Sequence, residues 1–67
     1  MKATLITLTN EAAIEEMFKI DATDLKRCVY NEATKEFYIV SEEGITVFYN
    51  GKSFDVENED EAEVYIV

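Results

Sequence analysis

Apolar residues recur with two different periods along this chain, and the change of period separates the elements that we expect. Residues 3–8 are apolar or β-branched, which is typical of a β-strand. Thr9 or Asn10 then offers a helix N-cap. Four apolar residues follow at helical spacing, namely Ala13, Ile14, Met17 and Phe18. The first third of the chain therefore predicts a strand and an amphipathic helix that ends near Ile20.

The second half of the chain alternates apolar and polar residues and is interrupted by turns. Residues 27–31 and 36–40 flank a four-residue connection of a length that commonly joins antiparallel strands. Asn50 and Gly51 predict a two-residue type I′ turn, because both residues tolerate positive φ. These loop lengths set the cross-strand pairs: Tyr30 with Phe37, Val29 with Tyr38, Cys28 with Ile39, Tyr49 with Lys52, Phe48 with Ser53, Val47 with Phe54, Thr46 with Asp55, and Ile45 with Val56.

The connection between these two hairpins decides which side chains share a face. The Ser-Glu-Glu-Gly stretch that ends at Gly44 suits a three-residue loop with a left-handed glycine. Ile39 would then face Val47, and Tyr38 would face Phe48. That register gathers the following residues on one face: Cys28, Tyr30, Phe37, Ile39, Ile45, Val47, Phe54 and Val56. A four-residue loop would instead exchange the faces of the first hairpin.

The last segment, residues 58–67, permits two interpretations. Asn58 and Glu61 have the spacing of a helix capping box. Residues 64–67 are β-branched or aromatic, which favours a strand, and we expect a terminal strand. The fold expected is α+β in a single domain over residues 1–67: one strand, one helix, then a three- to four-stranded antiparallel meander with the helix packed on one face.

The charge of the chain restricts its partners. Fifteen acidic and six basic residues in 67 give a net charge of −9, which repels nucleic acid and anionic membranes. A hydrophobic content of 48% still favours a folded chain. We therefore expect a protein partner, with no direct nucleic-acid or membrane binding. The single Cys28 excludes an intramolecular disulfide, and no apolar segment has the length of a signal or membrane span, so we expect a cytoplasmic protein.

Catalytic and metal-binding patterns are missing from the sequence. There is no histidine, and Ser41, Ser53 and Cys28 have no base beside them in sequence. The acids at 55, 57, 59 and 61 lack the central glycine and the Asp or Asn ligands of a calcium loop. We expect neither an enzyme nor a cofactor or metal site.

An apolar stripe is expected on the sheet face away from the predicted helix. In the preferred register it consists of Val29, Tyr38, Val40 and Phe48. One helix covers one face, so the stripe would be covered by a curled edge strand or the terminal segment, or would bind a partner. We expect it to form a homodimer interface.

The acidic run after the second hairpin is the other candidate surface. Glu57, Glu59, Glu61 and Glu63 alternate, so an extended segment would project them from one side at intervals of about 6.6 Å. A solvated tail is the plainer interpretation. Joined by Asp55, Glu42 and Glu43, however, the row begins to resemble a track of phosphates.

In this respect the chain resembles the small acidic proteins, many of them phage-encoded, that imitate DNA. The resemblance rests on small size and on one group of residues: Asp55, Glu57, Glu59, Asp60, Glu61 and Glu63. It implies a decoy that binds a basic nucleic-acid-binding protein and inhibits or regulates it. The alternative is a structural or adaptor module that binds a protein through an apolar sheet face, with the charge serving solubility alone.

Overall fold

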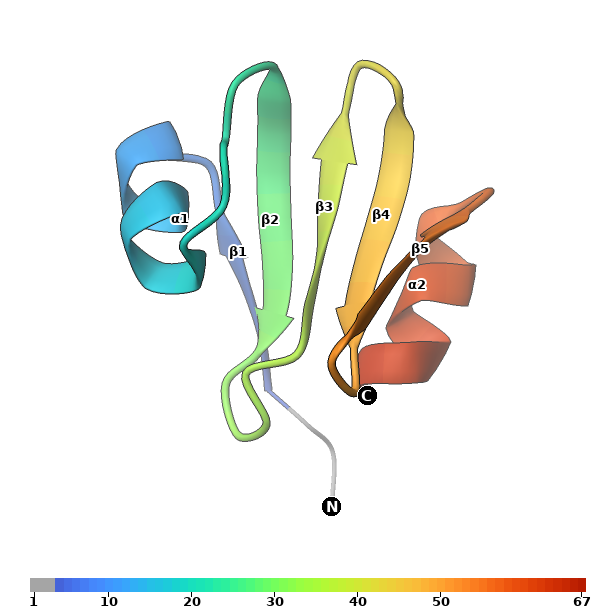
Figure 1. Cartoon of the computed structure of the whole chain (residues 1–67). Helices are drawn as coiled ribbons and strands as arrows, with labels where there is room; N and C mark the ends of the chain where they lie inside the picture. The colour runs from blue at the N-terminus through green and yellow to red at the C-terminus, as the bar shows by residue number, and fades with distance from the viewer. Residues whose placement is uncertain (1–3) are drawn as a thin grey trace.

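A five-stranded antiparallel sheet and two helices make up residues 4–67, the part of the chain that the computed structural model describes (Figure 1). The strands lie side by side in chain order, from β1 to β5. The elements are β1 (Leu5–Leu8), α1 (Glu11–Phe18), β2 (Leu25–Asn31), β3 (Phe37–Ser41), β4 (Gly44–Tyr49), β5 (Lys52–Val56) and α2 (Glu59–Ile66). The predicted α+β fold, with a strand, a helix and a four-stranded meander, is confirmed. Residue 3 of the first predicted strand lies outside the described residues.

Helix α1 begins at a predicted cap but ends two residues before the predicted end near Ile20. The Asn10 side chain accepts a hydrogen bond from the Ala13 N–H at 3.0 Å, so Asn10, one of the two candidates from the sequence, is the N-cap. The helix ends after Phe18 because Lys19 adopts a left-handed conformation with φ 58°, and its N–H donates to the Glu15 carbonyl. The short helix then leads through residues 20–24 to the start of β2.

The two hairpins have the predicted pairings. Tyr30 lies opposite Phe37 across β2 and β3, and Val47 lies opposite Phe54 across β4 and β5. Asn50 and Gly51 have φ values of 53° and 77°, as a type I′ turn requires. These registers follow from loop length alone, so local sequence was sufficient to predict them.

The register between β3 and β4 differs from the predicted one by a single residue. Only Glu42 and Glu43 form the loop, and Gly44 already pairs with Ser41. Tyr38 therefore faces Val47, and Phe48 lies opposite Phe37. Because a shift of one residue moves a strand's side chains to the other face, the single apolar face expected from the sequence is wrong. The observed two-residue loop gives the same distribution of faces as the four-residue alternative.

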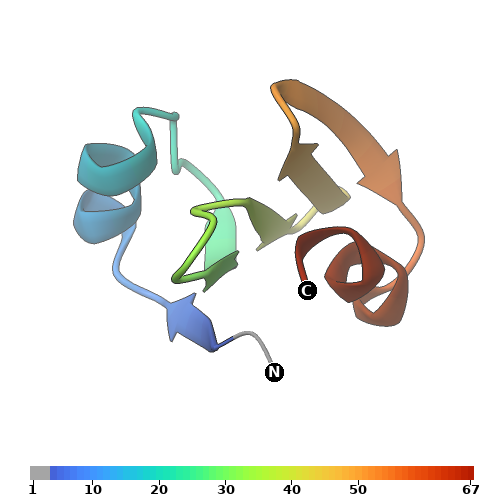
Figure 2. The same cartoon turned by 90° about the horizontal axis from the view of Figure 1, so that it is seen from below.

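Each face of the sheet is covered by its own helix (Figure 2). The buried cluster on the α1 side consists of Ile14, Ala22, Leu25, Cys28, Tyr30 and Phe37. The buried cluster on the α2 side consists of Val29, Tyr38, Val47, Ala62 and Ile66. Since full burial of one large apolar side chain contributes about 1.5–3 kcal/mol, both clusters are needed for a domain of this size.

The predicted terminal strand is wrong, because residues 59–66 form α2. Asn58 caps this helix by accepting from the Glu61 N–H at 2.9 Å, and the Glu61 carboxylate accepts from the Glu57 N–H at 3.1 Å. Ala62 and Ile66, one turn apart, are buried against the sheet. Capping and burial together outweigh the strand propensity of the last residues, because intrinsic propensity is small and is overridden by packing.

A buried asparagine ties the last turn of α2 to the β2–β3 loop. The Asn31 amide donates to the Ile66 carbonyl at 2.6 Å, and its side-chain oxygen accepts from the N–H groups of Ala33 and Thr34. The side chain thus satisfies a carbonyl at a helix end, where the helix itself provides no donor. Asn31 is 3% exposed, so water cannot replace these bonds easily.

Replacing Asn31 by Asp should therefore destabilise the chain by about 2–3 kcal/mol. The carboxylate has no proton to donate to the Ile66 carbonyl, and its charge lies at the negative end of the α2 dipole. Urea unfolding measures the loss. Asn10→Asp is the matched control, since Asp caps a helix as well as Asn does and this site is exposed. Equal stability of the two variants would contradict the role assigned to Asn31.

Replacing Gly51 by Val should cost more than about 1 kcal/mol, because a β-branched residue is strained at positive φ. No atom lies within 4 Å of a Cβ built at Gly51, so the cost comes from the backbone alone. Gly51→Asn is the control and should cost less, since asparagine tolerates this conformation. A Val variant with the urea midpoint of the unsubstituted protein would rule out the strain.

Candidate functional site

The acids singled out from the sequence lie along the β5 side of the molecule (Figure 1). Glu42 and Glu43 form the β3–β4 loop, and Asp55 is on β5, the outer strand. Glu43 and Asp55 line one shallow hollow, which places the loop beside β5. The others lie in α2 or directly before it. We call the exposed members of this group the acidic edge: Glu42, Glu43, Asp55, Glu57, Asp60 and Glu61.

The extended row of glutamates predicted from their alternation is wrong. Glu57 precedes α2, and the other three are in it, so the helix distributes them around its axis. Glu61 points back to the Glu57 N–H as part of the cap. Glu59 and Glu63, four residues apart, share one side of the helix and are partly buried.

Glu59 and Glu63 belong to a polar cluster beneath α2. One oxygen of each carboxylate lies 3.4 Å from the Tyr38 hydroxyl, and Arg27 on β2 forms an ion pair with Glu59. The hydroxyl has one proton, so it donates to one carboxylate at a time. Burial raises the pKa of Tyr38, and the negative charge of Glu63 raises it further. These two glutamates contact side chains of the sheet and are less exposed than the acids of the acidic edge.

The acidic edge is not neutralised by neighbouring cations. Arg27 and Glu59 form the only ion pair within 4.0 Å in the part of the chain that the structure describes. Asp55 accepts a hydrogen bond from the Thr46 hydroxyl at 2.9 Å, which leaves its charge uncompensated. Lys35 and Lys52 lie at or beside the β2–β3 and β4–β5 loops, at the opposite end of the strands from the β3–β4 loop. The six carboxylates therefore act together on whatever approaches this side.

The four residues predicted to form an exposed apolar stripe do not share one face of the sheet. Val29 and Tyr38 are buried beneath α2, and Val40 packs against the same cluster. Phe48 is on the other face, stacked on Phe37 with ring centroids 4.5 Å apart. The stripe is absent because α2 covers one face and the β3–β4 register moves Phe48 to the other. These four residues therefore do not form one exposed apolar surface.

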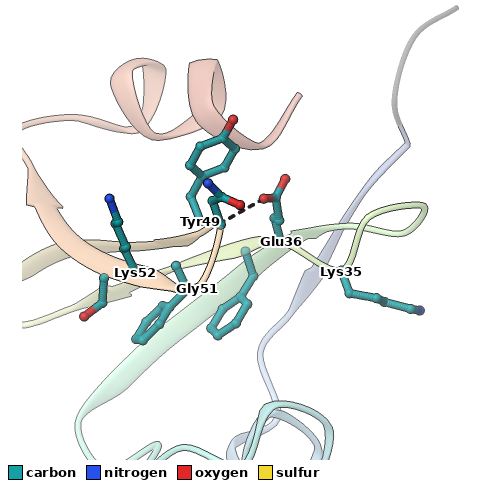
Figure 3. A pocket seen from close by; sticks show the side chains of 9 residues that line it. Lys35, Glu36, Tyr49, Gly51 and Lys52 are labelled. Atoms are coloured by element: carbon teal, nitrogen blue, oxygen red, sulfur yellow. Dashed lines mark hydrogen bonds between the residues drawn. The ribbon is translucent and has the colours of Figure 1, made fainter.

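A hollow of about 460 Å³ lies between the β2–β3 and β4–β5 loops (Figure 3). Phe37 and Phe48 contribute apolar walls. Lys35 and Lys52 extend outward on different sides of the hollow, and Glu36 accepts a hydrogen bond from the Asn50 N–H at 3.1 Å (Figure 3). The two lysine side chains therefore do not converge on one point of the hollow.

Cys28 is a core residue. It is fully buried between β-strands and α1, and burial raises its pKa to about 12. A thiol that stays protonated is a poor nucleophile and a poor metal ligand. Among residues 4–67, no group of three or more Cys, Asp or Glu side chains is arranged to hold a metal ion.

Comparisons with known proteins found no similarity to this chain. No protein-family model matches it, and neither a curated protein nor a solved structure is significantly similar to it. Neither of the helices described within residues 4–67 is long and apolar enough to cross a bilayer.

Replacing Tyr38 by Phe should change the pH dependence of stability more than stability itself. Near neutral pH the loss should stay below about 1 kcal/mol, because contacts of this length are weak. Since the folded-state pKa is raised above the ordinary 10.0, the unfolded chain loses this proton first, and stability falls as pH rises past that value. The Phe variant lacks this contribution, so it should lose less stability between pH values below and above 10.0. Urea midpoints at both pH values measure the difference, and identical losses would contradict the shielding of the Tyr38 hydroxyl.

Proposed function

We propose that this chain is an acidic decoy that binds the basic surface of a nucleic-acid-binding protein and thereby inhibits or regulates it. The observation that carries the proposal is the acidic edge, whose six exposed carboxylates have no basic partner within 4.0 Å among the described residues. Such a surface attracts the same basic clefts that attract phosphates. The role is binding and competition, with no catalytic step.

The electrostatics of the whole chain support this role. Like charges on a compact domain repel one another and lower its stability, so a net charge of −9 is not explained by folding alone. The residues of the acidic edge lie on a tight loop, a strand and a capped helix or directly before it, which orders their backbone before binding. Preformed positions reduce the entropy lost on association. A buried, unpaired Cys28 also suits action in a reducing cytosol.

The adaptor alternative requires a free apolar sheet face. Both faces of this sheet are covered, one by α1 and the other by α2. An adaptor that uses such a face therefore has no support in this fold, and the decoy remains the proposed function.

Affinity capture from the native host tests the decoy directly. Immobilised protein should retain at least one basic nucleic-acid-binding protein, and added nucleic acid should compete with the chain for it. A captured set without such proteins, or capture that nucleic acid leaves unchanged, would refute the proposal.

Three substitutions at the acidic edge should weaken binding to the captured partner. Glu57→Gln, Asp60→Asn and Glu61→Gln remove three exposed charges and keep acceptor oxygens for the α2 cap. The combined variant should associate more slowly and should show a shallower salt dependence, because steering by charge is lost. Binding rates at low and high salt measure both effects.

The matched control removes three exposed charges from α1, on the other side of the sheet, through Glu11→Gln, Glu15→Gln and Glu16→Gln. Glutamine at position 15 still accepts from the Ala22 N–H. This variant has the same net charge as the first and should bind almost as well as the unsubstituted chain. Equal effects of the two variants would mean that overall charge, and not the acidic edge, governs association.

A further inference from the structure

Helix α2 exposes an apolar side chain at the centre of its outward face. Val64 is 77% exposed, whereas Ile66 is buried against the sheet. Two residues along a helix correspond to a rotation of about 200°, so Val64 points almost directly away from the core. A surface helix normally carries polar residues there. Contacts within the described residues do not account for valine at this position.

Acidic side chains lie beside this valine, toward the start of the helix. Asp60 and Glu61 precede Val64 by four and three residues, which places them beside it on the helix surface. Two shallow hollows meet at Val64. One, of about 350 Å³, is lined by Glu61, Val64 and Tyr65, and the other, of about 260 Å³, is lined by Asp60, Glu63, Val64 and Val67. Each hollow therefore combines apolar walls with at least one carboxylate.

Tyr65 gives one of these hollows a firm wall. Its ring packs edge-on against Phe54 at 4.7 Å and lies 5.7 Å from Tyr49, measured between centroids. It remains 42% exposed despite these contacts. A tyrosine held by its neighbours loses little freedom on binding, which suits an anchor residue at a protein interface.

We propose that Asp60, Glu61, Val64 and Tyr65, here called the α2 patch, bind a cationic amphipathic helix of the partner. Its apolar side chains would enter the two hollows, and its Lys or Arg residues would lie over the flanking carboxylates. The inference rests on the proposed function, to which it adds the chemistry of the bound segment.

Charge complementarity selects this occupant over two others. A second copy of the chain would place Asp60 and Glu61 against their own equivalents, and like charges in contact disfavour that association. A purely apolar segment would cover the same carboxylates without pairing them, which is costly. A segment with apolar and basic residues one helical turn apart matches both features of the patch.

Two synthetic peptides test the proposal on the full chain. One is a helix-forming peptide with leucines along one face and lysines beside them, and the other has serine in place of every leucine and the same charge. The leucine peptide should bind, should shift the backbone amide NMR signals of α2, and should keep part of its affinity at high salt. The serine peptide should lose its binding there, because only charge attracts it.

Val64→Ala should weaken binding of the leucine peptide about tenfold, the loss expected for one apolar contact of roughly 1.4 kcal/mol. Alanine favours the helix more than valine does, so the variant should remain folded, and circular dichroism checks this. Met17→Ala on α1 is the matched control, since Met17 is also exposed, at 46%, but lies on the other side of the sheet. It should leave the affinity unchanged.

The outcomes separate this proposal from the decoy. Equal affinities of the Val64 and Met17 variants, or shifts confined to α1, would overturn the α2 patch and leave the decoy intact. A weaker Val64 variant together with a failed capture experiment would support the patch and refute the decoy. Self-association of the unsubstituted chain that Val64→Ala abolishes would identify a second copy as the occupant and would also overturn the proposal.

Discussion

The packing of α2 on the sheet is the contact on which the rest of the structure depends. Ala62 and Ile66 cover Tyr38 and Val47, which are completely buried. Exposing these side chains would cost about 1.5–3 kcal/mol each, against a total stability of about 5–15 kcal/mol for an ordinary domain. Each helix has only eight residues and would not persist alone in water. Sheet and helices therefore stabilise one another, and a helix packs on each face of the meander.

Local signals were sufficient to predict most elements but not the arrangement of the two faces. The N-cap Asn10 and the Asn50-Gly51 turn act through neighbouring residues, and both were predicted correctly. The Ser-Glu-Glu-Gly stretch before β4 fits loops of different lengths, so its register is set by what covers each face. The prediction of a terminal strand left only one helix to cover the sheet. The three-residue loop was predicted for a separate reason, namely that it gathers the largest apolar residues on one face, and a second helix removes the need for such a face.

The acidic residues of the candidate surface could be identified from composition, but their directions could not. Glu59 and Glu63 share a side only because α2 is a helix, and that side meets Tyr38 and Arg27 of distant strands. Asn31 was missed, although it gave a signal: it is a polar residue that ends a run of buried strand residues and precedes a turn. Side-chain amides at such positions often bind nearby backbone N–H groups. Its bond to the Ile66 carbonyl depends on tertiary structure, and no local pattern predicts it.

The two ends of α2 are stabilised in different ways: acidic side chains lie at its start, and a side-chain amide donates a hydrogen bond at its end. The first of these contacts accounts for the position of the acids that α2 contributes to the surface. Glu59, Asp60 and Glu61 occupy the first turn, where the positive end of the helix dipole favours negative charge. The last turn has no basic residue, and the Asn31 amide supplies a donor there instead. The acids at the start of α2 thus stabilise the helix while they contribute charge to the surface. Neutralising Asp60 and Glu61 one at a time would weaken this support only slightly, since each dipole contact contributes about 0.3–1 kcal/mol. The charge of this surface is therefore compatible with the local stability of α2, even though the net charge of the chain opposes folding.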